Sequence, residues 1–304
     1  MLDFSNISKS YGSQLAVDGI SFHVDKGERF GLVGPDGAGK STLIRILATL
    51  LLPDSGTATF DNRDVVKEYR YIRKYIGYMP GTFSLYNDLS VDENLQFYAK
   101  VFNTTIHENY HMIKDIYEQL QPFRNRRAGA LSGGMKQKLA LCCALVHKPK
   151  AMLLDEPTTG VDAVSRKEFW EMLGNLESVE ITVLVSTSYM DEAAQCHRVA
   201  LMQEGSILST NTPECITNSF PKELYRIKAK ENYNLLITLR NHFTDIDVYP
   251  CGEYLHMASD KTINFKEMHA FLNSKGLEDT EISVVNPDIE DCFIELMNRQ
   301  KTVV

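Results

Sequence analysis

A glycine-rich loop is the strongest chemical signal in the sequence, because it fits the phosphate-loop pattern G-x-x-x-x-G-K-[ST] in full. The loop consists of Gly34, Pro35, Asp36, Gly37, Ala38, Gly39, Lys40 and Ser41, and Thr42 opens a helix predicted over 42–52. Small residues let backbone N–H groups approach phosphate oxygens, and a helix N-terminus adds about half a positive charge. We expect Lys40 to neutralise the β- and γ-phosphates of a nucleotide and the Ser41 hydroxyl to ligate Mg²⁺.

Two adjacent carboxylates, Asp155 and Glu156, follow a predicted buried strand over 151–154. Alone, such a pair more often marks only a strand that ends in a polar loop. Beside a phosphate loop, Asp155 at the strand tip is expected to join the Mg²⁺ shell, and Glu156 to polarise an attacking water. The pair therefore predicts a site that both binds and hydrolyses a nucleotide.

A second helix start, over residues 131–137, could also bind an anion. Ser132 can cap this helix, and Gly133 and Gly134 leave its first N–H groups accessible. The apolar residues on the following stripe, which would bury the helix, are Met135, Leu139, Cys142, Cys143 and Val146. By itself the segment is only a helix start, so its meaning depends on the two motifs described above.

The elements that position these motifs alternate between strands and helices in the first part of the chain. Strands are predicted over 29–33, 151–154 and 181–185, which favours a largely parallel sheet. Between residues 90 and 147 the pattern is helical and begins with a capping box at Ser90 and Glu93. We therefore predict an α/β domain with a helical insertion over about 82–147.

Glycine usage divides the chain, since 16 of its 18 glycines precede residue 215. We expect an ATP-binding domain over 1–215 and a smaller accessory domain over 216–304. The second segment predicts the order β-α-β-β-α-β with an added final helix, which fits a ferredoxin-like unit.

Composition limits the alternatives for the chain as a whole. Its 304 residues suggest about two domains, and 43% hydrophobic and 24% charged residues are an ordinary globular balance. A net charge of −8 disfavours nucleic acid as a partner. We expect no membrane span and no signal segment, and we interpret the six cysteines as reduced thiols.

Together the three motifs resemble the ATP-binding subunit of ABC transporters, most closely the drug-exporter (daunorubicin-resistance) type. The resemblance implies a P-loop NTPase ABC cassette with a helical insertion, followed by a small α+β domain. It implies ATP and Mg²⁺ as cofactors. Its partners would be a membrane-spanning transporter subunit and a second ATP-binding subunit. The chain would then be cytoplasmic and peripheral on the inner face of the cytoplasmic membrane.

The resemblance also assigns roles to individual residues. Tyr11 matches the aromatic residue that stacks on adenine, and the less favoured alternative is a packed aromatic at a turn. Glu156 matches the catalytic base, and Asp162 lies in the D-loop. The signature, which reaches the γ-phosphate of ATP held by the opposite subunit, comprises Leu131, Ser132, Gly133, Gly134 and Gln137.

Two positions depart from the family pattern. The family has a glutamine at the position of Gly81 and a histidine at the position of Ser188, and both contact the reacting phosphate or its water. Losing one such donor usually costs roughly 10²–10³ in rate, so hydrolysis at this chain's own site is expected to be weak. That would favour a hetero-pair, or a tandem arrangement, over a homodimer. An active enzyme that tolerates both changes remains the alternative, because Glu156 is retained.

Two other classes of protein fit the motifs less well. A soluble ABC-family ATPase could act without membrane subunits, but ribosome-acting members usually carry two cassettes and DNA-repair members a long coiled coil. A P-loop kinase or GTPase has no use for a second anion-binding helix. The sequence names neither the transported substrate nor, with certainty, the direction of transport.

Overall fold

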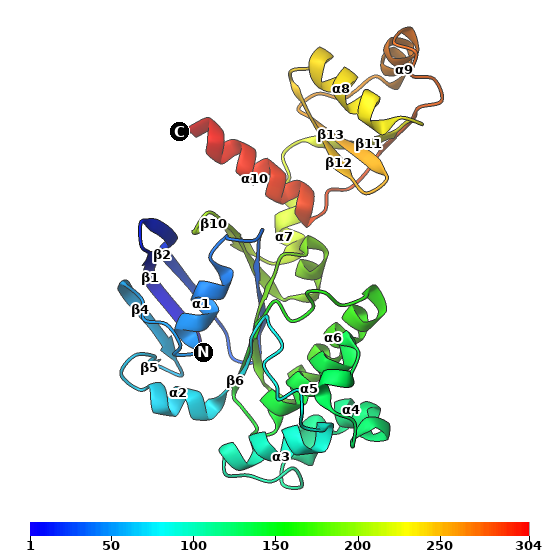
Figure 1. The fold of residues 1–304 in the computed structure, drawn as a ribbon. Helices are drawn as coiled ribbons and strands as arrows, with labels where there is room; N and C mark the ends of the chain where they lie inside the picture. Colours follow the sequence, from blue (N-terminus) through cyan, green and yellow to red (C-terminus); the bar gives the residue numbers. More distant parts are fainter. Residues whose placement is uncertain (304) are drawn as a thin grey trace. The chain divides into compact units, whose positions relative to one another are not determined.

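The computed structural model describes residues 1–303, apart from the side chains of residues 177, 178 and 300–303. The chain divides into two compact units, Met1–Pro213 and Glu214–Val304 (Figure 1). The division falls between residues 213 and 214, and the sequence predicts it between 215 and 216. Within residues 1–303, every helix is too short or too polar to cross a bilayer.

A six-stranded sheet in the order β10-β9-β3-β8-β7-β6 forms the centre of the first unit. Its strands are β3 (Arg29–Val33), β6 (Ile76–Met79), β7 (Ala151–Asp155), β8 (Thr182–Thr187), β9 (Arg198–Gln203) and β10 (Ser206–Asn211). All neighbouring pairs run parallel except β9 and β10. The predicted parallel sheet is therefore confirmed, and its strands β3, β7 and β8 end at one edge.

A second, antiparallel sheet was not predicted. It has the order β2-β1-β4-β5 and comprises β1 (Leu2–Tyr11), β2 (Gln14–Val24), β4 (Ser55–Phe60) and β5 (Arg63–Asp64). The rings of Phe4, Phe22 and Phe30 stack with centroids 4.4 and 5.2 Å apart. Because Phe4 and Phe22 belong to this sheet and Phe30 to β3, the stack joins the two sheets through one apolar core.

The helix after the phosphate loop, α1, spans Lys40–Leu47. The predicted range of 42–52 was therefore wrong at both ends. The chain leaves the helix at Thr49, whose φ of 61° is left-handed. The carbonyl of Arg45 then accepts hydrogen bonds from the N–H groups of Leu50 and Leu51, so the apolar run continues beyond the helix as a turn.

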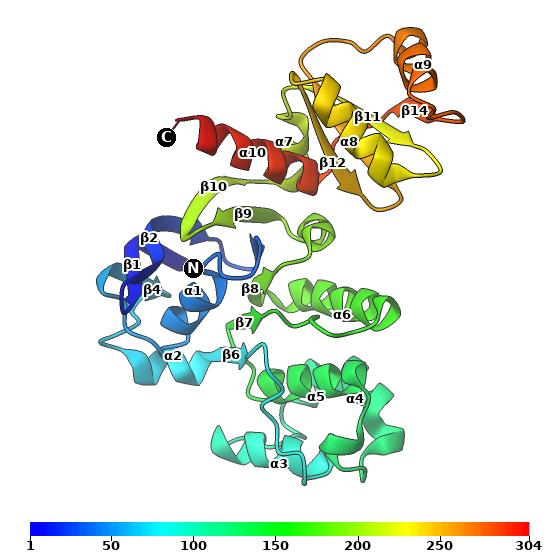
Figure 2. The same cartoon turned by 45° about the horizontal axis from the view of Figure 1, so that its top comes forward.

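The helical insertion follows β6 and is confirmed. Its helices are α3 (Val91–Val101), α4 (Tyr110–Leu120) and α5 (Gly133–Leu145), with short 3₁₀ turns η1 (Gln121–Phe123) and η2 (Ala128–Ala130). Outside the insertion, α2 (Tyr69–Tyr75) precedes β6, and α6 (Ala163–Asn175), η3 (Leu176–Val179) and η4 (Met190–Gln195) follow β7. The capping box of α3 is present, since the Ser90 N–H donates to Glu93 over 2.8 Å and the Glu93 N–H to Ser90 over 3.2 Å. Figures 1 and 2 both show α1 on one side of β7 and β8, and α5 and α6 on the other.

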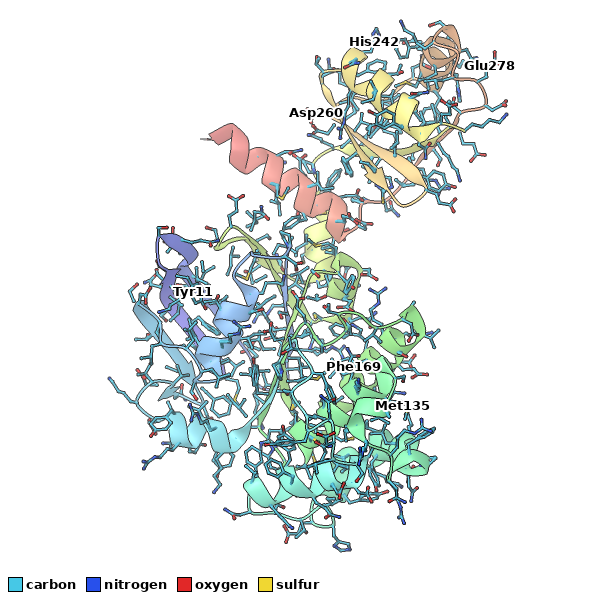
Figure 3. All side chains as sticks on the ribbon, viewed as in Figure 1. Tyr11, Met135, Phe169, His242, Asp260 and Glu278 are labelled. Atoms are coloured by element: carbon cyan, nitrogen blue, oxygen red, sulfur yellow. The ribbon has the colours of Figure 1, made fainter. Side chains whose placement is uncertain are left out.

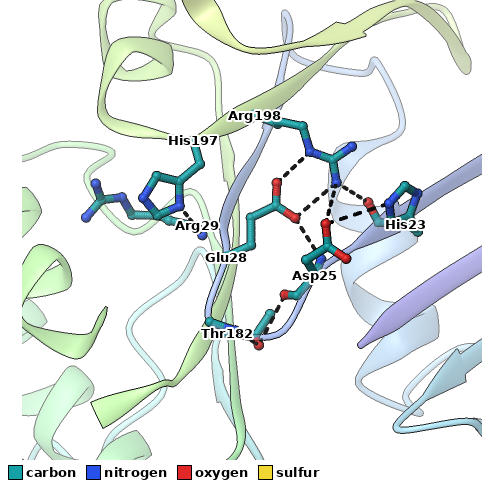
Figure 4. A network of polar contacts seen from close by, with 8 residues as sticks. His23, Asp25, Glu28, Arg29, Thr182, His197 and Arg198 are labelled. Atoms are coloured by element: carbon teal, nitrogen blue, oxygen red, sulfur yellow. Dashed lines mark hydrogen bonds and ion pairs between the residues drawn. The ribbon is translucent and has the colours of Figure 1, made fainter. Parts of the chain in front are cut away.

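A polar network connects the N-terminal ends of β3 and β9 (Figure 4). Glu28 is buried and receives two hydrogen bonds from Arg198, of 2.7 and 3.0 Å. Arg198 also donates to the carbonyl of His23, and the N–H of Arg29 donates to His197 over 3.0 Å. The bidentate pair fixes the starting ends of the strands. The phosphate loop lies at the opposite end of β3.

The second unit has the predicted ferredoxin-like order. Its elements are α7 (Pro213–Asn218, which begins at the last residue of the first unit), β11 (Glu223–Lys228), α8 (Asn232–His242), β12 (Ile246–Cys251), β13 (Tyr254–Ser259), α9 (Phe265–Ser274), β14 (Glu281–Val284) and the added helix α10 (Ile289–Val303). The strand order β12-β13-β11-β14 is fully antiparallel. Leu235 and Leu239 of α8 and Leu272 of α9 pack into one core with this sheet.

Candidate functional site

The phosphate loop leaves the carboxyl end of β3 and runs into α1. Gly37 and Gly39 adopt φ values of 82° and 101°, which side-chain-bearing residues rarely adopt. A Cβ at Gly39 would also lie 2.5 Å from the carbonyl oxygen of Ala16. The loop conformation therefore requires glycine at position 39 twice over, once for its φ and once for the close approach.

Lys40 is buried, with 3% of its surface exposed, at the start of α1. Its ammonium donates to the carbonyls of Gly34 and Pro35 over 2.7 and 2.9 Å, and lies 3.2 Å from Glu156 Oε1. A buried ammonium is stable only with such partners. The cation is thus held between the phosphate loop and the end of β7.

Ser41 and Asp155 meet as predicted, although they are 114 residues apart. The Ser41 hydroxyl donates to Asp155 Oδ1 over 2.6 Å, and the Ser186 hydroxyl donates to the same oxygen over 2.8 Å. Sequence reasoning missed Ser186. The register of β7 on β8 places Ser186 beside Asp155, and knowledge of that pairing would have identified it. A serine hydroxyl and a carboxylate are oxygen donors of the kind that Mg²⁺ takes.

Glu156 follows Asp155 with a left-handed φ of 47°, a conformation that costs roughly 1–3 kcal/mol in a non-glycine residue. Its N–H is held by the carbonyl and the hydroxyl of Ser186, at 3.1 and 2.9 Å. The Thr159 hydroxyl donates to its carboxylate over 3.1 Å. Ser186 therefore positions both residues. Its hydroxyl donates to the Asp155 carboxylate, and its hydroxyl and carbonyl accept the backbone N–H of Glu156.

The two departing positions, Gly81 and Ser188, lie at the same edge. A Cβ added at Gly81 would be 3.1 Å from the carbonyl oxygen of Asp155 and 3.9 Å from Glu156 Cβ. Ser188 directly follows Thr187, the last residue of β8, which is the strand next to β7. A longer polar side chain at position 81 would begin beside Glu156, and glycine supplies no such group.

The predicted signature segment forms the start of α5. Ser132 is the N-cap and accepts a hydrogen bond from the Met135 N–H at 3.4 Å. A Cβ at Gly134 would lie 2.6 Å from the Ser165 hydroxyl, so this glycine lets α5 approach α6 closely. Leu131 is buried, and Gln137 lies one turn into the helix. Ser132 itself is exposed and free to contact another molecule.

Asp162 caps α6 and lies between the end of β7 and that helix. Its carboxylate accepts from the N–H groups of Ser165 and Val164, at 3.0 and 3.1 Å. These hydrogen bonds, chiefly the one from Ser165, lower the pKa of the Asp162 carboxyl. Asp162 is therefore a charged helix cap that orients α6.

The phosphate loop and the signature segment lie apart in this chain. Figure 3 labels Tyr11 on the β1–β2 hairpin and Met135 in the first turn of α5, on opposite sides of the central strands. Tyr11 is 47% exposed at the end of β1.

A largely apolar groove of about 700 Å³ opens beside Gly81 and Glu156. The side chains that line its length include Leu50, Arg73, Tyr98, Val101, Phe102 and His147. Leu50 and Val101 are more than half exposed, and burial lowers the pKa of His147 to about 4, so its ring is neutral near pH 7. The sequence analysis did not predict a groove of this kind.

Comparison with known families gives a match over residues 17–159 to the family described as ABC transporter. The probable multidrug ABC transporter ATP-binding protein YbhF of Escherichia coli is 39% identical over 294 residues, which cover 93% of this chain and 49% of that protein. The chain thus spans about half the length of this relative. The Nod factor export ATP-binding protein I of Burkholderia thailandensis is 38% identical over 221 residues, 72% of this chain and 73% of its own length.

Solved structures with a similar fold are also ATP-binding cassettes of ABC transporters. A structure of an ATP-binding subunit of an ABC transporter has a TM-score of 0.66 at 25% identity and covers 72% of this chain and 93% of its own. A nucleotide-free ATP-binding cassette has a TM-score of 0.61 at 28% identity, with 72% and 94% covered. A bacterial cassette described as dimeric has a TM-score of 0.63 at 24% identity, with 70% and 98% covered.

Proposed function

Because the chain belongs to the ABC transporter family of ATP-binding cassettes, we propose that it is the ATP-binding subunit of an exporter and couples ATP binding and hydrolysis to transport. The names of two relatives support export, one a probable multidrug transporter protein and one a Nod factor export protein. The observation that carries the proposal is the presence in one chain of a complete phosphate loop and a signature segment with an exposed N-cap.

The nucleotide binds on what we call the loop side, which comprises residues 34–42, Gly81, Asp155, Glu156 and Ser188. Lys40 exchanges its loop carbonyls for phosphate oxygens when ATP enters, and the exposed ring of Tyr11 stacks on the adenine. Ser41 and Asp155 would hold Mg²⁺, which supplies charge neutralisation to the phosphates.

Hydrolysis on the loop side is weak. Glu156 is positioned to polarise a water, but neither Gly81 nor Ser188 carries the glutamine or histidine of the family. Each missing donor is worth roughly 10²–10³ in rate, although two losses in one site need not add. This chain therefore binds ATP on its loop side and releases it slowly, acting as a clamp.

The signature side, residues 131–137, completes the ATP site of a second subunit. Its N-cap Ser132 is exposed, and the segment lies across the central strands from the chain's own phosphate loop. In a homodimer the weakened loop side would occur twice. We therefore propose a hetero-pair, in which the competent site joins this signature side to the loop side of the other ATP-binding subunit.

A membrane-spanning subunit docks in the groove beside Gly81. The groove is apolar, about 700 Å³ in volume and flanked by the exposed side chains of Leu50 and Val101, which fits a short apolar segment of a partner. Through this partner the chain is held at the inner face of the cytoplasmic membrane.

ATPase assays test the proposal. The chain alone should hydrolyse ATP slowly, and addition of the second ATP-binding subunit and the membrane-spanning subunit should raise turnover at least about tenfold. Unchanged turnover on mixing would favour the soluble ATPase over the exporter subunit. In cell fractionation, the chain should leave the membrane when the gene for the membrane subunit is deleted.

A further inference from the structure

Glu192 is a buried carboxylate that no part of the proposed function uses. It lies in η4, four residues after Ser188, and is 3% exposed. A carboxylate this deep is costly unless its oxygens are hydrogen-bonded. Both are: the Thr158 hydroxyl donates to Oε1 over 2.7 Å, and the Thr187 hydroxyl donates to Oε2.

These two threonines belong to different segments of the site. Thr187 ends β8 and accepts the Tyr189 N–H over 3.0 Å, so it shapes the turn that carries Ser188. Thr158 lies in the loop between Glu156 and Asp162 and is 1% exposed. Through these two hydrogen bonds, the buried Glu192 carboxylate connects the turn after β8 to the loop after β7.

The same loop continues into the signature side. Asp162 ends the loop and caps α6, and Ser165 in the first turn of α6 packs directly against Gly134. On the surface, Arg166 of α6 lies 3.7 Å from Asp191 and its guanidinium 4.6 Å from the centre of the Tyr189 ring. A continuous set of contacts thus leads from the turn at Ser188 through Glu192 to the start of α5.

We propose that Glu192 is a positioning residue, which, through Thr158, holds the loop 156–162, α6 and the signature side where they complete the ATP site of the second subunit. This inference rests on the proposed hetero-pair. It predicts that damage to the Glu192–Thr158 bond lowers turnover at the partner's site and leaves ATP binding by this chain alone unchanged, because the bond touches neither Lys40 nor the phosphate loop.

The test replaces Thr158 with valine, which keeps the shape and removes the hydroxyl, and with serine, which keeps the hydroxyl. In the assembled transporter, Thr158→Val should lower kcat about tenfold at unchanged KM, a typical size for coupling between sites. Thr158→Ser should restore at least half of the wild-type kcat. ATP affinity of the isolated variant chains should equal that of the wild type.

A second variant keeps the inference falsifiable. Glu192→Met keeps a similar length, removes both acceptor oxygens and should lower kcat at least as far, and the double variant with Thr158→Val should lose no more than Glu192→Met alone, because the bond to Thr158 is then already absent. Wild-type kcat in Thr158→Val, or weaker ATP binding by the isolated variant, would overturn the positioning role. If the wild-type mixture itself shows no stimulated turnover, the proposed function fails before the role of Glu192 is reached.

Discussion

The loop side and the signature side of this chain each end in a helix N-terminus, but they carry different side chains. The loop side has the left-handed glycines, the buried Lys40 and the Ser41–Asp155 contact, and a glycine, Gly81, beside Glu156. The signature side keeps its cap and the glycine that packs against Ser165. On the proposed function, the comparison separates the features that hold a nucleotide from those that hydrolyse it.

The largest effect is expected on ATP binding, from removal of the Lys40 ammonium on the loop side. Lys40→Ala should weaken ATP binding by the isolated chain at least about 100-fold, because a buried triphosphate loses a charge-assisted partner. Isothermal titration of wild type and variant measures this, with Lys67→Ala as a control that removes an exposed lysine outside both the loop side and the signature side. Equal affinities in wild type and Lys40→Ala would show that the loop side binds no nucleotide.

The next largest effect should come from the signature side in the assembled transporter. Ser132→Asp keeps a good N-cap but places a negative charge where phosphate should approach, so turnover should fall about 100-fold or more. Ser132→Asn keeps the cap and the size without the charge, and its turnover should stay within about threefold of wild type. Position 132 is a better probe than Gly134, where any Cβ would also collide with Ser165.

If Ser132→Asp and Ser132→Asn behave alike, phosphate does not approach this helix, and the signature side is no half-site. Melting temperatures of the two variants provide the folding control. Both should match wild type, because aspartate and asparagine cap helices about as well as serine.

The smallest effect should come from the base on the loop side. Glu156→Gln in this chain should change turnover of the assembled transporter by less than about threefold, because the working site uses the base of the other subunit. The matched glutamate-to-glutamine change in that subunit should silence the transporter. A silent complex from Glu156→Gln alone would mean that this chain's own site does the work.

Much of the site was predictable because its signals are local. The phosphate loop, the pair Asp155–Glu156 and the cap Ser132 each follow from spacing within a few residues. Ser186 and Glu192 were not predictable in this way. Their roles depend on which strands are neighbours, and the pairing of β7 with β8 joins residues about 30 positions apart.

In the fold, too, features with local signals were predictable and features that depend on distant pairing were not. The β-α-β-β-α-β order of the second unit was visible from alternation and turn signals. The antiparallel sheet of the first unit was missed because register shifts in β1, between Phe4 and Ile7 and again before Lys9, interrupt its alternation of buried and exposed residues. The end of α1 was missed because the apolar run continues past Leu47, whereas the backbone turns at Thr49.

The measurement that tests the central claim most directly restores the two missing side chains. Gly81 has no left-handed φ, and its Cβ would sit 3.1 Å from a neighbouring carbonyl oxygen, so a glutamine can be placed there with a small shift. In the isolated chain, Gly81→Gln combined with Ser188→His should raise ATPase turnover at least about tenfold, and adding Glu156→Gln should abolish the gain. Turnover in wild type as high as in the restored variant would contradict a weakened loop side.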